Sequence, residues 1–528
     1  MRKRLLVLLV VCLSLILCLQ PMASAGVLLG GGGSSGGSPG TWYIGATPPN
    51  VDYTKPVLVF VHGKGGWSGS WFEPTVYHGT NDMYAYAYNN GYRTAFTDLY
   101  PDKSMWANGE LLNRQLDEIT AYFGVSKVTI VAHSKGGLDV NSASVHYGAN
   151  PKISRIVTLG SPHWGSPVAD MAYSTWTWWL AALLGERNDA TYVLQTGYMS
   201  YFRSITDGRD PVPYYTLSGY KCGPVFTALW MGCAVIGGED DGLVGVSSAR
   251  IPGGTHLKEG YWDHDEIRMG SRTWSWFAPV IRTAGTASPA VASVGAKLAA
   301  AGGQPTDAGR GNGKPEAPGS LIMRGGTTTE HATATFPVES GVRGATFTFL
   351  ASSRDFTATL VGPDGSAQNV TMASQVDKSE VFAGAWTGSV TVANPAAGQW
   401  TLKAAAGSET GYFMLADLDS DLKATLDVGS GVAVPGAKQE LKVGFRGKAP
   451  AQSRAEAAVA MAGQQVHGRP AFSQAGGVHT ALLDLPAGNG IHNVTVTVTG
   501  TLPDGTAFER SLVTSVAAVA PGDRGTWK

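Results

Sequence analysis

Four unbroken apolar runs, separated by longer segments, constrain the fold more than any other feature of this chain. They are VLVFVHG at 57–63, VTIVAHS at 128–134, RIVTLGSP at 155–162 and VPYYTLSGY at 212–220. Strands that are apolar on both faces are typical of a parallel sheet covered by helices on both sides. Residues 108–123 carry large apolar side chains at helical spacing and are expected to form the crossover helix before the second run. The pattern therefore predicts an α/β fold with a doubly wound, mostly parallel sheet.

The segments that precede the first apolar run differ from it in composition. Residues 1–25 combine a basic start, an apolar stretch and an Ala-Ser-Ala site, which predicts a cleaved signal peptide and a secreted protein. Residues 26–50 are rich in Gly, Ser and Pro and are expected to be a flexible leader. The predicted α/β domain then spans residues 51–282.

The C-terminal part of the chain has a different composition and a different pattern of apolar residues. Residues 283–325 are rich in Ala, Gly and Pro, which predicts a linker. Short alternating strands and two Pro-Asp-Gly turns follow, and they predict two all-β, sandwich-like modules at 326–418 and 419–528. We expect these modules to contact the cell surface or a polymer.

Charge and cysteine content narrow the function. The formal net charge is −1, and removal of a basic signal peptide makes the chain more acidic, which argues against a nucleic-acid partner. Cys222 and Cys233 are the two cysteines outside the signal peptide. An even pair in an exported chain predicts one disulfide that closes a short loop, and two buried free thiols are the alternative.

The stretch AHSKGG, residues 132–137, contains the candidate nucleophile. A nucleophile elbow needs a strand that enters it, a tight turn with small neighbours and a helix that leaves it. An apolar run precedes Ser134, Gly136 and Gly137 follow it, and Ala132 replaces the first glycine of the usual G-x-S-x-G pattern with another small residue. The plain alternative is a strand that ends in a polar turn.

The order of the other groups narrows the candidates for a base and an acid. In α/β-hydrolases the acid follows the serine and the histidine follows the acid, which leaves His256 and His264. The acid candidates are Asp207, Asp210, Glu239, Asp240 and Asp241. We favour Asp241, in the turn-rich loop GGEDDGLV, with His264 as the base. The histidine would take the serine proton, and the carboxylate would hold its tautomer.

Two further features complete the predicted site. The oxyanion hole is assigned to the backbone N–H groups of Lys135 and Lys64, with Gly65 as the alternative to Lys64, and the two lysine charges are expected to be incidental. The apolar segment 170–184 contains Trp176, Trp178 and Trp179. It predicts either a buried helix or a lid that forms the substrate rim.

Several motifs together resemble the secreted bacterial triacylglycerol lipases of the α/β-hydrolase fold. They are VHGKGG, AHSKGG, TLGSPHWGSPVAD, DDGLV and HDEI, and they extend over residues 56–275. The resemblance implies the same triad of Ser134, Asp241 and His264. Members of that family often hold calcium near the catalytic histidine through two aspartates. Asp265 matches one of them and no residue matches the other, so no metal is assigned and no cofactor is expected.

These observations predict a secreted serine ester hydrolase, a lipase or carboxylesterase that acts on a lipid or polyester substrate. One alternative is an extracellular polyhydroxyalkanoate depolymerase whose β modules hold the polymer. An alternative of another class is a surface-attached binding protein with an inactive hydrolase domain.

Overall fold

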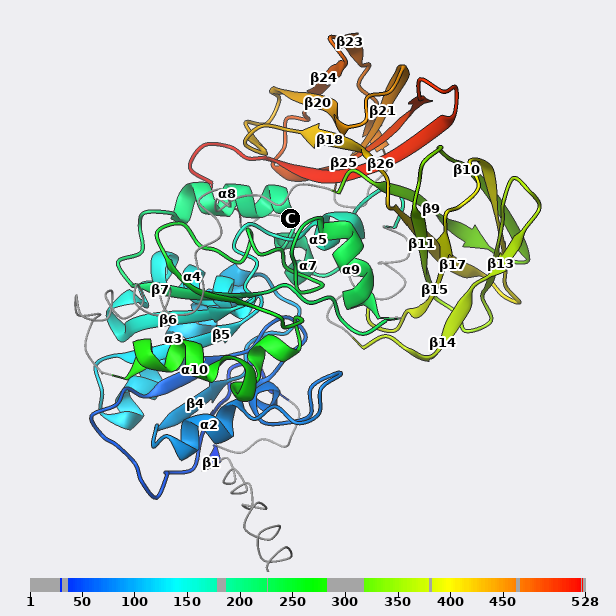
Figure 1. Cartoon of the computed structure of the whole chain (residues 1–528). Coiled ribbons are helices and arrows are strands. Elements are labelled where there is room, and N and C mark those ends of the chain that lie inside the picture. Colours follow the sequence, from blue (N-terminus) through cyan, green and yellow to red (C-terminus); the bar gives the residue numbers. More distant parts are fainter. Residues whose placement is uncertain are drawn as a thin grey trace, which may run out of the picture.

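The computed structural model describes residues 29–30, 37–177, 187–225, 227–282, 318–378, 382–461, 466–523 and 525. An α/β domain is followed by two β modules that pack beside it (Figure 1). Among the described residues, every helix is too short or too polar to span a bilayer.

A single sheet of eight strands organises the α/β domain, in the order β1-β2-β4-β3-β5-β6-β7-β8. Strands β3 to β8 pair in parallel, whereas β2 pairs antiparallel with β4, and β1 with β2. The strands are β1 (Leu29–Gly30), β2 (Trp42–Ile44), β3 (Leu58–Val61), β4 (Thr94–Thr97), β5 (Val128–His133), β6 (Ile153–Leu159), β7 (Tyr214–Gly219) and β8 (Thr255–Gly260). The prediction of a doubly wound, mostly parallel sheet is confirmed.

Helices cover both faces of this sheet. They are α2 (Met83–Asn89), α3 (Met105–Phe123), α4 (Gly136–His146) and α10 (Gly270–Ile281), with the 3-10 turns η1 (Ser68–Trp71), η2 (Asn150–Lys152) and η3 (Glu266–Arg268). Val59 and Val61 of β3 pack with α3 and α4, whereas Leu58 and Phe60 pack with α2 and α10. Because successive side chains of a strand point to opposite faces, a strand covered on both sides is apolar at every position.

A third apolar core lies above the carboxyl ends of the strands. Helices α5 (Pro167–Ala172), α7 (Asp189–Val193) and α8 (Thr196–Thr206) follow β6, and α9 (Ala228–Ile236) follows β7. Their buried side chains form one cluster with apolar residues of both β modules. The predicted disulfide between Cys222 and Cys233 is present, with 5.8 Å between the Cα atoms, and it ties α9 to the segment after β7.

Part of the segment predicted to be a flexible leader is instead a strand of the sheet. Trp42, Tyr43 and Ile44 pair with β4, and the Gly40 N–H donates to the Asp98 carbonyl. The physical reason is local: three consecutive residues with high strand propensity follow the glycine-rich stretch and extend an open sheet edge.

Each β module is a pair of mostly antiparallel sheets. The strand orders are β10-β16-β12-β13 and β14-β15-β11-β17-β9 in the first module, and β18-β20-β24-β23 and β19-β26-β25-β21-β22 in the second. Within the second module, the pair β19–β26 is parallel. The first module contains β9 (Leu321–Thr328), β10 (His331–Val338), β11 (Gly344–Ala351), β12 (Thr357–Val361), β13 (Ala367–Asn369), β14 (Thr371–Val376), β15 (Trp386–Ala393), β16 (Gly398–Ala405) and β17 (Thr410–Leu418). Strand β9 thus starts inside the segment predicted to be a linker.

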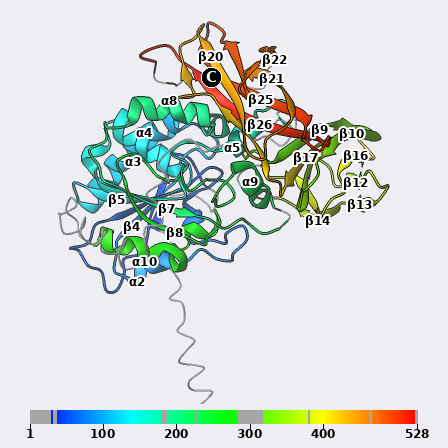
Figure 2. The same ribbon diagram turned by 45° about the horizontal axis from the view of Figure 1, so that its top comes forward.

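The second module contains β18 (Leu422–Asp427), β19 (Val432–Ala433), β20 (Lys438–Gly447), β21 (Gln452–Met461), β22 (Val466–Gly468), β23 (Ser473–Ala475), β24 (Val478–Asp484), β25 (Gly490–Thr501) and β26 (Ala507–Ala518). Strand β26 lies against α5 and α8 of the α/β domain, as both views show (Figures 1 and 2). The predicted sandwich-like architecture is confirmed, and the modules cover the helices that follow β6.

Candidate active site

Ser134 sits on a strained turn between β5 and α4. Its φ angle is 52°, a backbone conformation that non-glycine residues rarely adopt. Strand β5 ends at His133 and helix α4 begins at Gly136. Strain of this kind persists where the surrounding structure enforces it, and such positions cluster at active sites. The structure therefore places Ser134 at the geometry of a nucleophile elbow.

The glycines around Ser134 lie too close to neighbouring atoms to carry a side chain. A Cβ atom at Gly136 would lie 2.4 Å from the His62 carbonyl oxygen, and one at Gly137 would lie 2.2 Å from Ser161 Oγ. A Cβ at Gly63 would lie 2.7 Å from Ser134 Cβ. The turn thus packs directly on the loop after β3, which is the loop predicted to supply an oxyanion donor.

Asp241 and His264 form a buried pair. The His264 Nδ1–H donates to Asp241 Oδ2 at 2.8 Å, and Asp241 Oδ1 accepts the N–H groups of Leu243 and Val244 at 3.0 and 2.8 Å. Three donors therefore fix the position of the carboxylate. Protonation at Nδ1 leaves Nε2 as the basic nitrogen of His264, which a general base requires.

His264 lies beside the residue that precedes the candidate nucleophile. The His133 and His264 ring centroids are 4.7 Å apart, and the His133 Nε2–H donates to the His264 carbonyl at 2.9 Å. A Cβ atom at Gly160 would lie 2.9 Å from Asp241 Oδ2 and 3.4 Å from His264 Nδ1. The turn after β5, the loop between α9 and β8 and the loop after β8 therefore bring Ser134, Asp241 and His264 to one end of the sheet.

The other acid and base candidates have different partners. His256 is on β8, with Nδ1 2.8 Å from Thr216 Oγ1 and Nε2 3.3 Å from Ser218 Oγ. Asp207 pairs with Arg203, and Asp210 accepts the hydroxyls of Ser144 and Tyr214. Glu239 is exposed at the start of the turn that presents the acid. These contacts favour the pair Asp241 and His264.

Asp240, next to the candidate acid, is buried and accepts the Gly242 N–H at 2.8 Å. Burial, and then the charge of Asp241, raises the pKa of Asp240 to about 7. The unfolded chain releases this proton near pH 4. Between about pH 4 and about pH 7, the folded protein thus keeps a proton that the unfolded chain has lost. Over this pH range, Asp240 lowers the free energy of unfolding by about 1.4 kcal/mol for each unit that the pH rises.

Substitution of Asp240 by asparagine removes this ionisation and preserves the acceptor for Gly242. We expect the free energy of unfolding of Asp240→Asn, relative to the unsubstituted protein, to increase by about 1.4 kcal/mol per pH unit from about pH 4 to about pH 7 and to stay level above that. Urea unfolding at a series of pH values measures the difference. A difference that does not change with pH contradicts the buried, protonated carboxyl.

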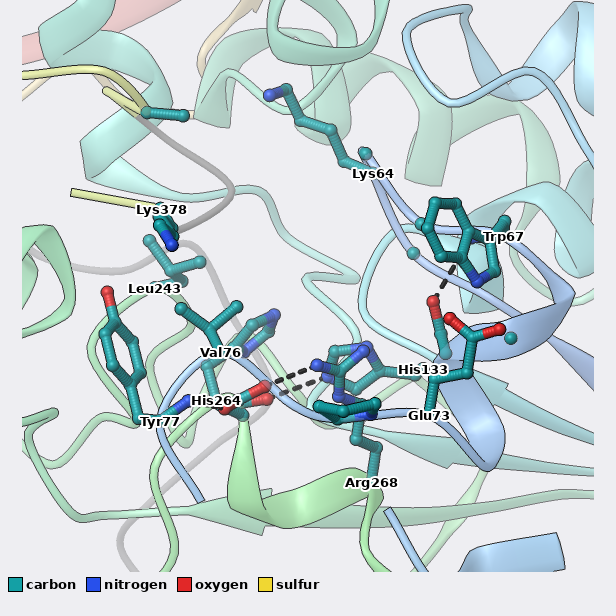
Figure 3. Close-up of a pocket in the computed structure, with 18 of the residues that line it drawn as sticks. Lys64, Trp67, Glu73, Val76, Tyr77, His133, Leu243, His264, Arg268 and Lys378 are labelled. Carbon is teal, nitrogen blue, oxygen red and sulfur yellow. Dashed lines mark hydrogen bonds and ion pairs between the residues drawn. The ribbon is translucent and has the colours of Figure 1, made fainter. Parts of the chain in front are cut away.

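The loop after β3 favours Lys64 over Gly65 as the second oxyanion donor. The Gly65 N–H donates to the Pro101 carbonyl at 3.1 Å, and the Gly66 N–H donates to the Gly63 carbonyl at 3.3 Å. The Lys64 side chain extends away from His133 and His264 (Figure 3). A contribution of Lys64 to the site would therefore come from its backbone.

A pocket of about 370 Å³ lies over these residues. It is lined by Gly63, Lys64, His133 and His264, by the apolar side chains of Val76, Tyr77, Leu229 and Leu243, by the charged Glu73 and Arg268, and by Lys378 and Ala383 of the first β module (Figure 3). Its size falls within the usual range of small-molecule pockets, about 300–1,000 Å³. Sequence reasoning missed Lys378 and Ala383, because no local pattern marks a contact from a separate module.

The predicted lid is described only in part. Trp176 is half-buried and packs against the third apolar core. Trp178 and Trp179 lie outside the described residues. Leu229 of α9 and Leu243 belong both to this core and to the pocket wall.

The carboxylates near His264 already have charged and polar partners. Asp265 already pairs with Arg268, and its Oδ2 accepts the Tyr77 N–H at 2.9 Å. Asp263 and Glu266 share the Lys221 ammonium, at 3.6 and 2.6 Å, and His78 Nε2 lies 2.7 Å from Asp263 Oδ2. Calcium takes oxygen ligands, and these carboxylates are engaged by the side chains of Lys221, Arg268 and His78.

The solved structures that are similar to this chain include two of one bacterial lipase. The Bacillus licheniformis lipase BlEst2 in propeptide form is 30% identical, with a TM-score of 0.71, and the match covers 92% of this chain and 99% of that one. The mature form of BlEst2 is 45% identical over 47% of this chain and 100% of that one, with a TM-score of 0.43. No family model matches this chain, and neither does any curated protein sequence.

Proposed function

Because this chain belongs to the lipases and esterases of the α/β-hydrolase fold, we propose that it is a secreted serine hydrolase that cleaves apolar acyl esters. The observation that carries the proposal is Ser134 at φ 52° on a strand-to-helix turn, next to the hydrogen-bonded pair of Asp241 and His264. A degenerate hydrolase domain in a binding protein would have no reason to keep this strained turn together with a paired acid and base.

The proposed reaction has two halves. Ser134 Oγ attacks the ester carbonyl carbon while His264 Nε2 takes its proton, and the Lys64 and Lys135 N–H groups hold the resulting oxyanion. The tetrahedral intermediate then collapses, the C–O bond of the ester breaks, and the alcohol leaves with the proton from His264. Ser134 is left with the acyl group, and water repeats the sequence to release the acid. Asp241 stabilises the imidazolium in both halves.

The pocket wall favours an apolar acyl group. Val76, Tyr77, Leu229 and Leu243 provide apolar contacts over the site. A panel of p-nitrophenyl butyrate, emulsified tributyrin and polyhydroxybutyrate tests the substrate class. Turnover of soluble esters and tributyrin supports a lipase or carboxylesterase, and a rate increase above the solubility limit of tributyrin selects a lipase. Preferential turnover of the polymer selects a depolymerase, and inactivity on every ester supports the binding protein.

The second β module is fastened to the helices that follow β6. Ser515 Oγ accepts the Gly197 N–H at 2.8 Å and donates to Asp170 Oδ1 at 2.6 Å. The Asn493 Nδ2–H donates to Gln195 Oε1 at 2.7 Å. These buried contacts join β25 and β26 to α5 and α8.

The first β module reaches the pocket itself. Asp377 Oδ2 accepts the Tyr77 hydroxyl at 3.2 Å and the Ala228 N–H at 2.8 Å, which anchors the segment after β14 to the α/β domain. Lys378 and Ala383, on the same segment, line the pocket. The first β module therefore forms part of the pocket wall.

We propose that the two β modules are a pro-region that limits substrate access until it is removed. The likeness to a lipase in propeptide form over 92% of this chain supports this role, as do Lys378 and Ala383 in the pocket wall. Retention on a polymer or the cell surface is the other role that we consider for these modules, and the variant below distinguishes the two.

Gly197 offers a substitution that loosens the contact of the second module with little effect on the helix. A Cβ atom there would lie 2.8 Å from the Ser515 carbonyl carbon and oxygen. Alanine is otherwise favoured over glycine within a helix. Strand β26 of the second module also packs against β9 and β10 of the first module, which lines the pocket. We expect Gly197→Ala to raise kcat/KM of the full-length chain for p-nitrophenyl butyrate several-fold, because displacement of the second module shifts the first module away from the pocket.

The matched control is Gly488→Ala, where a Cβ would meet no atom within 4 Å. It lies in the same β module and should leave the rate unchanged. An unchanged rate for Gly197→Ala, with intact folding, contradicts the pro-region and favours surface or polymer retention.

A further inference from the structure

Lys135, directly after the candidate nucleophile, has a buried side chain. Its Nζ lies 2.7 Å from Asp139 Oδ1, one turn further along α4, and the two side chains are 1% and 2% exposed. Removing two charges from water is unfavourable unless each finds close partners. The Lys135 charge, expected from the sequence to be incidental, is buried in a close ion pair, and this pair requires an explanation.

The ion pair continues into helix α3. The Asn108 Nδ2–H donates to Asp139 Oδ2 at 2.9 Å, and Asn108 is itself 1% exposed. Asn108 also accepts the Tyr100 N–H and donates to the Tyr100 carbonyl, both at 3.0 Å. One amide side chain thus fixes the segment after β4 to the first turn of α4.

The same segment holds the loop after β3. The Leu99 N–H donates to His62 Nε2 at 3.0 Å, and the His62 Nδ1–H donates to the Gly63 carbonyl at 2.7 Å. These two bonds require one neutral tautomer. Burial lowers the pKa of His62 to about 4, so the ring stays neutral at neutral pH. Both ring nitrogens are thereby satisfied, and the peptide that leads into Lys64 is held in place.

We infer that this buried chain of polar groups, from Lys135 through Asp139, Asn108, the 99–100 segment and His62 to Gly63, positions the two oxyanion donors relative to each other. The inference rests on the proposed function. Strands β3 and β5 are paired as far as Val61 and Ala132, and the two donors lie beyond these strand ends. An oxyanion hole works only when both donors are held near 3 Å from one oxygen before the reaction begins. Lys135, Asp139, Asn108 and His62 are then positioning residues.

The test replaces the buried pair by apolar side chains of similar size in the full-length chain. The double variant Lys135→Met/Asp139→Leu keeps the Lys135 backbone N–H and removes the link to Asn108. Such replacements are often neutral for stability. We expect kcat for p-nitrophenyl butyrate to fall by about 10- to 100-fold with little change in KM, which is less than the about 10²–10³-fold loss when a donor is removed altogether. The affinity for a phenylboronic acid, whose tetrahedral adduct occupies the oxyanion hole, should fall with kcat.

Ser144→Ala is the matched control, because Ser144 is on the same helix and its hydroxyl donates to Asp210, outside this chain of contacts. Its kcat and boronate affinity should not change. Asn108→Ser breaks the chain of contacts in the middle and decides the question if the double variant does not fold.

Retention of kcat and boronate affinity in folded variants overturns the inference. So does a loss of thermal stability without a loss of boronate affinity. If Ser134→Ala retains activity, the proposed function itself fails, and that result is distinct from either outcome.

Discussion

Replacement of Ser134 by alanine will abolish ester hydrolysis. We expect kcat/KM for p-nitrophenyl butyrate to fall by about 10⁴-fold or more, because no other group can form the acyl-enzyme once the hydroxyl is gone. The residual rate will come from the oxyanion donors and from substrate binding. Steady-state kinetics on the purified protein measure the loss.

The control for this experiment is a second buried serine on the helix that follows the elbow. Ser142 is fully buried and lies within α4, and Ser142→Ala should retain most of the rate. Hydrolysis that survives Ser134→Ala would show that another residue is the nucleophile.

The second large effect is expected at Asp241. In Asp241→Asn, an amide replaces the carboxylate that accepts the His264 Nδ1–H. The imidazole then loses both the correct tautomer and the charge that stabilises its protonated form. A loss in kcat of about 10⁴-fold is expected with the geometry intact.

The neighbouring Asp240→Asn is a matched control, since it makes the same chemical change one residue away. Asp240 binds the Gly242 N–H, so its variant should stay within a few-fold of the original kcat. Equal losses of kcat in the two variants would contradict the assignment of Asp241, and not Asp240, as the catalytic acid.

Much of the α/β domain can be predicted from the sequence because its signals are local. Apolar runs such as 57–63 and 128–134 are continuous because both faces of the sheet are covered. Ser134 is recognisable because a strand, small turn residues and a helix occupy adjacent positions. The order of the acid and the histidine after the serine then reduces the number of candidates for these two roles.

Other features depend on contacts between distant residues. Trp42–Ile44 reads as part of a glycine-rich leader, and only the open edge at β4 makes it a strand. Lys378 and Ala383 reach the pocket from a module more than one hundred residues beyond the triad. The contacts of the Lys135 side chain are likewise only partly local. Its partner Asp139 is one helical turn away in the sequence. Asn108, which hydrogen-bonds to Asp139, belongs to another helix.

A covalent label identifies the nucleophilic residue itself. Incubation of the purified protein with an alkyl p-nitrophenyl phosphonate, followed by digestion and mass spectrometry, identifies the residue that forms the stable ester. If Ser134 is the nucleophile, one adduct is expected, on the peptide that contains Ser134, and none in Ser134→Ala. An adduct on another residue, or no adduct in a protein that hydrolyses esters, would contradict the assignment of Ser134 as the nucleophile.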